Sequence, residues 1–260
     1  MSTPQSAPKT TPVRVRGDSP SLRLRAVETV GGVLPKPLRL ALAWPWYHDF
    51  HELGLATPQR RGHFGPNQRA KESDILSRLR IAVDEVKGSG SVPSVADLFC
   101  ADGFYSFYAR RMGAGRIHAL DLDPNEIARG RIACAALGEQ NIEIACKDVL
   151  KWVPPEPVDI TLCTGGLYHL TDPAALLAHI RSYTTRFMVL QTVVTLETNA
   201  PEHFVTPAPG WSHGSRFSVA WLQQALEARG WSVLDTAQNE LPGNWRRSDR
   251  GSVYMLCKAK

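Results

Sequence analysis

The stretch VADLFCADGF, residues 95–104, decides the fold, because it reads as a buried strand that runs into a tight turn and then a helix. The apolar run follows Pro93, and Gly103 opens an amphipathic segment from Phe104 to Met112. The first backbone N–H groups of a helix have no partner within the helix, so a glycine turn beneath them forms a pocket for a polar ligand. The stretch therefore predicts a nucleotide-type pocket in an α/β domain.

The glycine positions of this turn distinguish two ligand classes. A dinucleotide-binding turn needs G-x-G-x-x-G, but Phe99, Ala101 and Phe104 stand at those positions, so this fingerprint fails. The other pattern is an acidic residue at the strand end followed by G-x-G-x-G, here Asp97 and then Phe99, Ala101 and Gly103. It resembles motif I of the Rossmann-like S-adenosylmethionine-dependent methyltransferases, with one glycine of three kept. The resemblance implies that these four residues line the cofactor site, in a loop reshaped by the Phe99 ring.

Composition favours one globular domain with a loose N-terminal end. The chain has 260 residues, of which 43% are hydrophobic, enough for one sizeable core. No apolar run is long enough to cross a bilayer, and the N-terminus lacks the apolar segment of a secretory signal, so we expect a cytoplasmic protein without membrane partners. The five cysteines form no C-x-x-C pair, so we expect reduced thiols and no metal site.

Most of the positive charge lies in the N-terminal segment. The formal net charge is +5, and residues 1–27 hold five basic residues against one acidic residue, which leaves the rest nearly neutral. A protein that binds a nucleic-acid backbone is expected to carry a basic stripe on its fold, so an extended contact with RNA is disfavoured. Residues 1–37, rich in Ser, Thr, Pro and Arg, are predicted to be a disordered basic tail.

An aromatic segment precedes the main domain, which we place at residues 66–260. Residues 38–65 include Trp46, Tyr47 and His48, and this clustering is typical of a lid over a pocket or of a segment anchored to the core by its tryptophans. We predict that these three side chains contact the substrate. Apolar residues then recur at helical spacing across residues 67–86, which predicts a helix that lies on the sheet.

The second and third strands end in acidic residues. Residues 116–121 form a strand ending at Asp121, which lies 24 positions after Asp97, the spacing at which a parallel sheet delivers a carboxylate to ribose hydroxyls. Asp121 and Leu122 are therefore predicted to contact the cofactor. A third strand, residues 142–146, leads to Asp148 and Val149. At this point the methyltransferase family has an acid that meets the adenine amine and an apolar residue that covers the ring.

The fourth strand, residues 158–163, leads into TGGLYHLTDP, residues 164–173, the most specific match in the chain. It resembles the family's motif after the fourth strand, a glycine turn followed by an apolar–aromatic pair, a histidine and a capped helix. The resemblance implies that Thr164 and Tyr168 line the cofactor site. His169, just beyond the strand, is the candidate general base for an acceptor that must lose a proton.

The remaining residues complete a doubly wound, seven-stranded, mostly parallel sheet, whose last strand, residues 252–257, the family topology implies is antiparallel at the edge. The long segment between the fifth strand and its helix, residues 197–217, is expected to close over the site. Trp211, His213 and Arg216 of this segment are predicted to contact the substrate.

These motifs, in order over residues 94–180, predict an S-adenosylmethionine-dependent methyltransferase. The stretch after the fourth strand and the aromatic segment are most similar to the branch with tRNA wobble-uridine carboxymethyltransferases and related small-molecule enzymes. Because the fold lacks an evident basic surface, we expect a small-molecule acceptor methylated at oxygen, with tRNA as the alternative. A non-catalytic cofactor-binding subunit is the third interpretation, because two motif I glycines are missing. The sequence leaves the acceptor, its reacting atom and the oligomeric state open.

Overall fold

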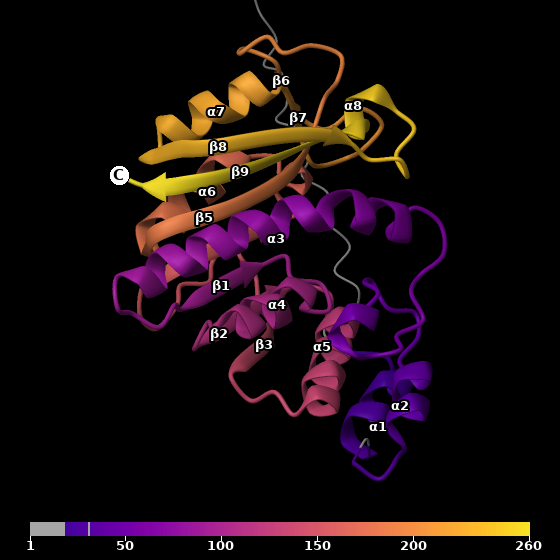
Figure 1. The fold of residues 1–260 in the computed structure, drawn as a ribbon. Coiled ribbons are helices and arrows are strands. Elements are labelled where there is room, and N and C mark those ends of the chain that lie inside the picture. Colours follow the sequence, from indigo (N-terminus) through magenta and orange to yellow (C-terminus); the bar gives the residue numbers. More distant parts are fainter. Residues whose placement is uncertain (1–18, 31) are drawn as a thin grey trace, which may run out of the picture.

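A computed structural model describes residues 19–30 and 32–260, and its centre is a seven-stranded sheet (Figure 1). The strand order is β3-β2-β1-β4-β5-β9-β8. The strands in that order are β3 (Ile142–Cys146), β2 (Ile117–Asp121), β1 (Val95–Leu98), β4 (Val158–Thr164), β5 (Thr184–Val194), β9 (Gly251–Ala259) and β8 (Trp231–Glu240). The chain order reverses between β1 and β4, where ligands of such sheets bind.

Strands β1 to β5 pair in parallel, and β9 is antiparallel to both of its neighbours, β5 and β8. The predicted sheet and its antiparallel last strand are confirmed. The predicted edge position of that strand is wrong, because β9 lies between β5 and β8 and leaves β8 at the edge. Strands β8 and β9 are consecutive antiparallel neighbours joined by residues 241–250, and their local sequence patterns do not determine which of the two lies at the edge.

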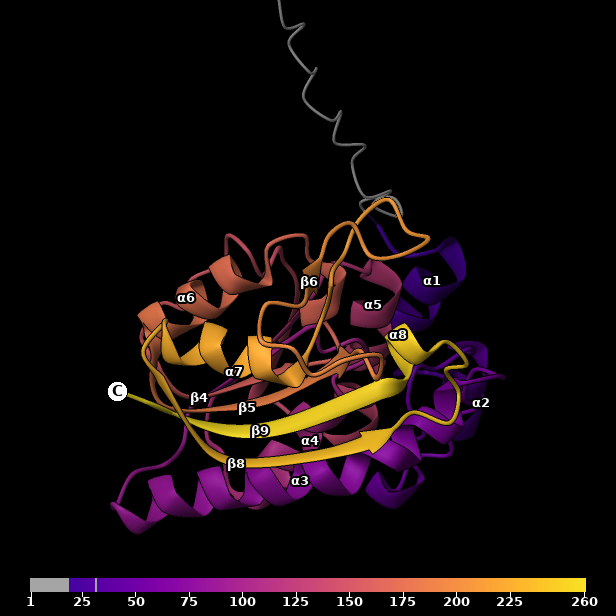
Figure 2. The ribbon, with the colours of Figure 1, turned by 90° about the horizontal axis from the view of Figure 1, so that it is seen from above.

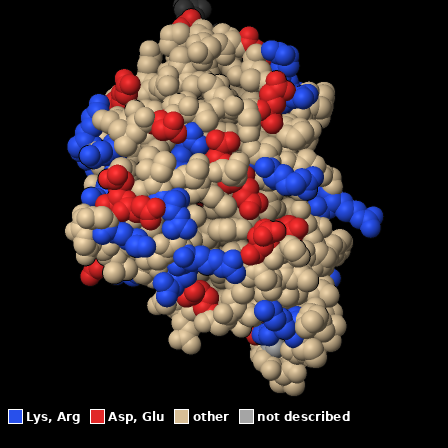
Figure 3. Space-filling model, in the orientation of Figure 1, with Lys and Arg blue, Asp and Glu red and all other residues tan. Residues whose placement is uncertain are grey.

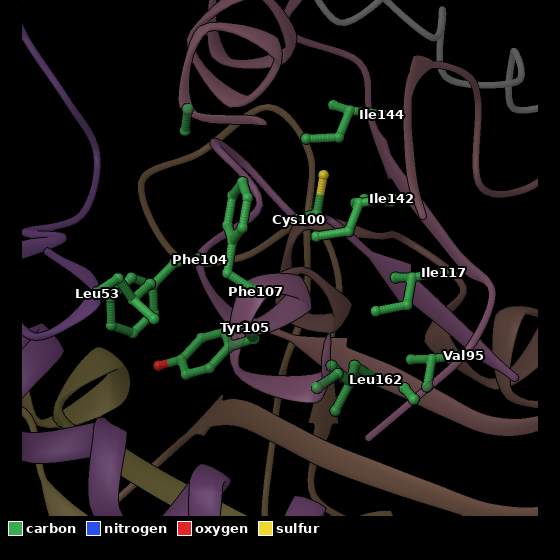
Figure 4. Close-up of a cluster of buried hydrophobic side chains, with 14 of the residues drawn as sticks. Leu53, Val95, Cys100, Phe104, Tyr105, Phe107, Ile117, Ile142, Ile144 and Leu162 are labelled. Atoms are coloured by element: carbon green, nitrogen blue, oxygen red, sulfur yellow. The ribbon is translucent and has the colours of Figure 1, made fainter. Parts of the chain in front are cut away.

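Helices cover both faces of the sheet. The long helix α3 (Phe64–Gly88), with α4 (Phe104–Met112) and α5 (Pro124–Leu137), packs on one face. Helices α6 (Pro173–Tyr183) and α7 (Val219–Glu227) pack on the other, as the view in Figure 2 shows for α3 against α6 and α7. In the core under α4, Phe104 and Phe107 project among side chains of β1 to β3 and Leu53 (Figure 4).

Three of these helices begin at the caps that their sequences indicate. Asp123 accepts the N–H of Asn125 at the start of α5, and Asp172 accepts the N–H of Ala175 at the start of α6. Each is followed by proline at the first helical position, where its missing N–H costs nothing. At the start of α7, the Ser218 hydroxyl accepts the N–H of Trp221. The caps place the start of each helix just beyond a strand or loop that reaches the pocket.

Part of the predicted tail is ordered. Helix α1 (Leu22–Val30) packs against α5, and α2 (Lys36–Leu42) packs against both. Leu24, Val27 and Leu40 are buried there, so the predicted disorder is wrong for residues 22–30 and 36–37. Residues 1–18 lie outside the described residues. A short 3-10 helix, η1 (His51–Leu53), follows in the aromatic segment.

The long segment after β5 is folded onto the domain. It forms a small hairpin of β6 (Phe204–Val205) and β7 (Arg216–Phe217), and α8 (Arg247–Arg250) lies near it between β8 and β9. A second 3-10 helix, η2 (Leu167–His169), follows β4. Across residues 19–30 and 32–260, no helix combines the length and apolar character that a membrane span requires.

Candidate functional site

A cavity of about 490 Å³ opens at the carboxyl ends of β1, β2 and β4. Motif I, the ends of β2 and β4, the segment after β3, the aromatic segment and α3 all contribute to its wall. The lining residues are Tyr47, His48, Lys71, Phe99, Cys100, Ala101, Tyr105, Asp121, Leu122, Asp148, Leu150, Thr164, Gly165, Gly166, His169, Leu170 and His213. This volume suits a nucleotide-sized ligand.

The motif I loop has a backbone conformation that favours glycine at all three motif positions. The φ angles are 57° at Phe99, 49° at Ala101 and 81° at Gly103. The predicted reshaping is therefore not seen in these angles. Instead the Phe99 ring lies against Gly166, where an added Cβ would come within 1.9 Å of it, so Gly166 makes room for Phe99. A side chain in this region costs about 1–2 kcal/mol relative to glycine.

The strain at Ala101 predicts the sign of a substitution. Ala101→Gly is expected to leave the free energy of unfolding unchanged or raise it by up to about 1 kcal/mol, because relief of the positive φ opposes the entropy that glycine adds to the unfolded chain. Ala82→Gly, at a buried position inside α3, is expected to lower it by about 1 kcal/mol or more. Urea unfolding measures both, and equal losses would show that Ala101 is unstrained.

Asp121 is fixed by the loop that it faces. Its Oδ2 accepts the N–H of Ala101 at 2.9 Å, and its Oδ1 accepts the N–H of Asp123 at 2.8 Å. Burial raises the pKa of Asp121, and these backbone donors oppose that rise. Each carboxylate oxygen keeps a second lone pair, so the group can still accept two hydroxyls. Leu122 lies beside it, exposed on the cavity wall.

Asp148 lines the cavity from the segment after β3. Its Oδ1 accepts the N–H of Leu150 at 3.0 Å, and Lys151 lies 3.6 Å from its Oδ2. These contacts orient the carboxylate and leave it half-buried at the cavity. Val149 is buried in the core and does not line the cavity, where Leu150 stands instead.

Two other motif I residues act behind the cavity wall. Asp97 is fully buried and accepts a hydrogen bond from the Ser106 hydroxyl at 2.7 Å. Burial raises its pKa to about 7. Asp97 and Gly103 do not line the cavity, so they contribute by holding the loop and α4.

Thr164, the last residue of β4, and His169 in η2 line this cavity, whereas Tyr168 does not. Desolvation, followed by the nearby Arg216 cation and His213, lowers the pKa of His169. His169 is therefore neutral at pH 7 and a weak base. No other described residue forms a hydrogen bond or ion pair with its ring.

In the aromatic segment only Tyr47 and His48 reach the cavity. The His48 Nδ1 lies 2.5 Å from Oδ1 of Asp102, in the motif I loop. Trp46 is fully buried, donates from Nε1 to the Leu40 carbonyl at 2.9 Å and packs on Phe50. The predicted substrate contact of Trp46 is therefore wrong, because its ring is part of the core.

The segment after β5 brings only His213 to the cavity. Arg216 is buried, lies 3.3 Å from Asp249, and donates to the Ser215 carbonyl at 2.8 Å. Its guanidinium lies between the rings of Tyr168 and Trp211, 5.3 and 5.4 Å from their centroids. Arg216 and Trp211 thus brace the segment instead of lining the cavity. Their predicted substrate contacts are not seen.

A second, smaller cavity of about 80 Å³, here called the inner cavity, adjoins the first. Tyr47, His48, Lys71 and Gly165 belong to the walls of both cavities, so they mark the junction. The inner cavity is closed mainly by polar side chains from α3, β5 and the segment after β8. They are His63, Asn67, Gln68, Tyr168, Gln191 and Asn244.

The methyltransferase-domain family model matches residues 95–186, which run from β1 into β5 and hold motif I and the motifs at the ends of β2, β3 and β4. These residues are a methyltransferase domain. The S-adenosylmethionine-dependent methyltransferase expected from the motifs is confirmed, with S-adenosylmethionine as its cofactor. No curated protein matches the sequence.

Solved structures share the fold of the methyltransferase. The N-terminal domain of EvdMO1 with S-adenosylhomocysteine bound is 19% identical with a TM-score of 0.61, over 94% of this chain and 100% of that one. The N-methyltransferase NodS from Bradyrhizobium japonicum WM9 is 17% identical with a TM-score of 0.54, over 75% and 88%. Magnesium protoporphyrin IX methyltransferase from Synechocystis PCC 6803 is 16% identical with a TM-score of 0.52, over 74% and 83%.

Two residues at the methyltransferase cavity escape the motif analysis. Lys71 has no hydrogen-bond or ion-pair partner among the described residues, and burial lowers its pKa to about 8. The Tyr105 hydroxyl is buried without a partner in the same described part. An unpaired cation and an unpaired donor fit the carboxylate and other acceptors of S-adenosylmethionine. The sequence does contain one indication that Lys71 faces the site. It lies four residues before the buried Ile75 and therefore on the same face of α3.

Proposed function

We propose that the chain transfers a methyl group from S-adenosylmethionine to an oxygen of a small-molecule acceptor. The observation that carries the proposal is the pair of joined cavities, one sized for the cofactor and one for a compact polar group. The cofactor supplies a methyl group on a sulfonium, which is already activated for in-line displacement. The chain then has to align two ligands, exclude water and accept a proton.

In the large cavity we assign Asp121 to the ribose hydroxyls and Asp148 to the adenine amine. The two residues follow neighbouring parallel strands, β2 and β3, so their carboxylates serve successive parts of one ligand. Lys71 would pair with the carboxylate of the methionine part. These assignments use every charged side chain on the wall of the large cavity within the described residues.

A small-molecule acceptor fits the size and charge of the site better than tRNA does. The inner cavity, of about 80 Å³, holds only a few non-hydrogen atoms. On the face shown in Figure 3, Lys and Arg side chains alternate with Asp and Glu instead of forming a basic stripe. Magnesium protoporphyrin IX methyltransferase, which shares the fold, is itself named for a small-molecule acceptor.

An oxygen acceptor is favoured because two histidines, His48 and His169, line the large cavity. A hydroxyl must lose its proton as the methyl group arrives, so a neighbouring base speeds the reaction. Calorimetry with S-adenosylmethionine and label transfer from methyl-labelled cofactor test the proposal together. Binding followed by transfer to a small molecule is expected, and no binding of the cofactor would refute the proposal.

Lys71→Met is expected to weaken S-adenosylmethionine binding about 10- to 30-fold, or about 1.5–2 kcal/mol, because one charge-assisted contact is lost. The matched ligand is 5′-methylthioadenosine, which has the adenine and ribose but no carboxylate. Its dissociation constant should change less than about threefold in the same variant. Calorimetry on both ligands gives the comparison, and equal losses for both would remove Lys71 from the carboxylate.

The affinity for S-adenosylmethionine should also depend on pH through Lys71. The pKa of Lys71 is lowered to about 8 in the free protein and rises when a carboxylate joins it. Because the complex then holds more protons between these two values, affinity is full below pH 8 and falls above it, by up to about tenfold per pH unit. The affinity of the unaltered protein and of Lys71→Met is measured from pH 7 to 9.5. The part of the decrease that only the unaltered protein shows is due to this lysine. Parallel curves for the two proteins would contradict the assignment.

A further inference from the structure

His48 is held rigidly at the junction of the two cavities. The residue is 5% exposed, and its ring stacks on Phe104, with 4.8 Å between centroids and 17° between planes. The Tyr105 ring meets it edge-on, with 5.7 Å between centroids. These contacts fix the plane of the imidazole, so that its remaining accessible surface is the part that lines the cavities.

Asp102 determines which nitrogen of His48 carries the proton. This fully buried carboxylate accepts the N–H groups of Tyr47 and His48 on Oδ2, at 3.0 and 2.9 Å, and faces the His48 Nδ1 with Oδ1. A carboxylate that accepts from Nδ1 holds the proton there and leaves a lone pair on Nε2. No described residue forms a hydrogen bond with Nε2.

The inner cavity, which His48 also lines, presents an unsatisfied acceptor. The Gln191 Nε2 donates to the Ser252 hydroxyl at 2.9 Å, which fixes the amide, and its buried Oε1 has no partner among the described residues. An unpaired buried acceptor on a cavity wall indicates a ligand that brings a donor. A hydroxyl or a neighbouring N–H group of a compact acceptor would satisfy it.

We propose that His48, oriented by Asp102, is the general base that takes the proton of an acceptor hydroxyl held in the inner cavity beside Gln191. This rests on the proposed function and names the catalytic residue and the acceptor class. The acceptor O–H bond breaks and its proton moves to Nε2 of His48. An oxygen lone pair forms the new O–CH₃ bond, and the C–S bond breaks with its electron pair on sulfur, which leaves a neutral thioether.

The surroundings favour His48 over His169 for this role. His169 has no carboxylate behind it and faces the Arg216 cation and His213, so it holds a proton poorly. His48 has Asp102 behind Nδ1, which stabilises the imidazolium that forms when Nε2 gains a proton. Tyr47, Tyr105 and Lys71 are titratable groups that line the large cavity together with His48. Burial raises the pKa of both tyrosines, so they stay neutral.

The first test determines which ring nitrogen of His48 carries the proton, and it requires no acceptor. In ¹⁵N NMR of protein labelled at the histidine ring nitrogens, with S-adenosylhomocysteine bound at pH 8, His48 should show a protonated Nδ1 and an unprotonated Nε2. His48→Gln assigns the signals by their loss. Asp102→Asn should shift the proton distribution between the two nitrogens, which a purely structural role of Asp102 would not require. A proton fixed on Nε2 in the unaltered protein would overturn the proposal.

The second test measures transfer from methyl-labelled S-adenosylmethionine to an RNA-free ultrafiltrate of cells that carry the gene. His48→Gln should lower turnover at least 100-fold, with the cofactor dissociation constant changed less than threefold. His51→Gln, an exposed histidine of the same segment, should leave turnover unchanged. Added imidazole should restore part of the activity of His48→Ala, which leaves a gap where the ring was.

The outcomes separate this inference from the function on which it rests. If the unaltered protein neither binds the cofactor nor transfers label, the proposed function fails, and the same NMR measurement on the ligand-free protein still tests the pairing of His48 with Asp102. If the unaltered protein transfers label and His48→Gln keeps more than a third of its turnover, the general-base role is wrong. The same conclusion follows if His48→Ala is folded, binds the cofactor and gains nothing from imidazole.

Discussion

Trp46→Ala is expected to lower the free energy of unfolding by about 3–5 kcal/mol, the range for removing a large buried aromatic side chain. The ring is fully buried, packs edge-on against Phe50 at 5.6 Å between centroids, and its N–H reaches the Leu40 carbonyl. Alanine leaves both a cavity and an unpaired carbonyl. The effect on the cofactor site should be secondary, since Trp46 does not line it.

Trp245→Ala is the matched control for Trp46→Ala. Trp245 is 80% exposed, so its loss should change the free energy of unfolding by less than about 0.5 kcal/mol. Urea unfolding followed by circular dichroism measures both variants. A Trp46→Ala protein with unaltered stability and reduced acceptor turnover would restore the substrate contact expected from the sequence.

Asp121→Ala is expected to raise the dissociation constant of S-adenosylmethionine about 30- to 150-fold, or about 2–3 kcal/mol. Two ribose hydroxyls would lose a charged acceptor, and the Ala101 N–H would lose its partner in the motif I loop. Adenosine should show a similar loss. Adenine, which lacks the ribose, should bind the variant within about threefold of the unaltered protein.

Asp148→Ala is the comparison for Asp121→Ala. Asp148 follows β3 and is assigned to the adenine amine, so its loss should weaken adenine and adenosine by the same factor. Competition calorimetry against S-adenosylhomocysteine resolves the two patterns. If Asp121→Ala weakened adenine as much as adenosine, the carboxylate would act on the loop as a whole and the ribose assignment would be wrong.

The fold follows from the sequence wherever a local pattern determines the element. Strand β3 and helix α4 match their predicted bounds, and β1 lies in the stretch predicted to hold the first strand, because short apolar runs or helical periodicity end at clear turn or cap residues. The order of β8 and β9 in the sheet does not follow from local patterns. Helix α1 in the N-terminal segment does not follow from the local sequence pattern either, because it is stabilised by contacts with α5 rather than by its own periodicity.

The site was predictable where strand ends determine it and not where remote segments meet. Asp121, Asp148 and Thr164 line the cavity because parallel strands deliver their carboxyl ends to one edge. The pairing of His48 with Asp102 joins residues 54 positions apart, which no spacing rule connects. Trp46 and His48 are two positions apart in the same segment, but the Trp46 side chain lies in the core and the His48 side chain lines the cavity.

The central claim is methyl transfer to an oxygen of a small molecule, and one measurement tests it most directly. The protein is incubated with ¹³C-methyl S-adenosylmethionine and an RNA-free cell ultrafiltrate, in parallel with purified tRNA, and the labelled product is identified by ¹³C NMR. We expect an O-methyl signal in a small molecule and no label in tRNA. Label in tRNA, or an N-methyl product in the ultrafiltrate, would contradict it.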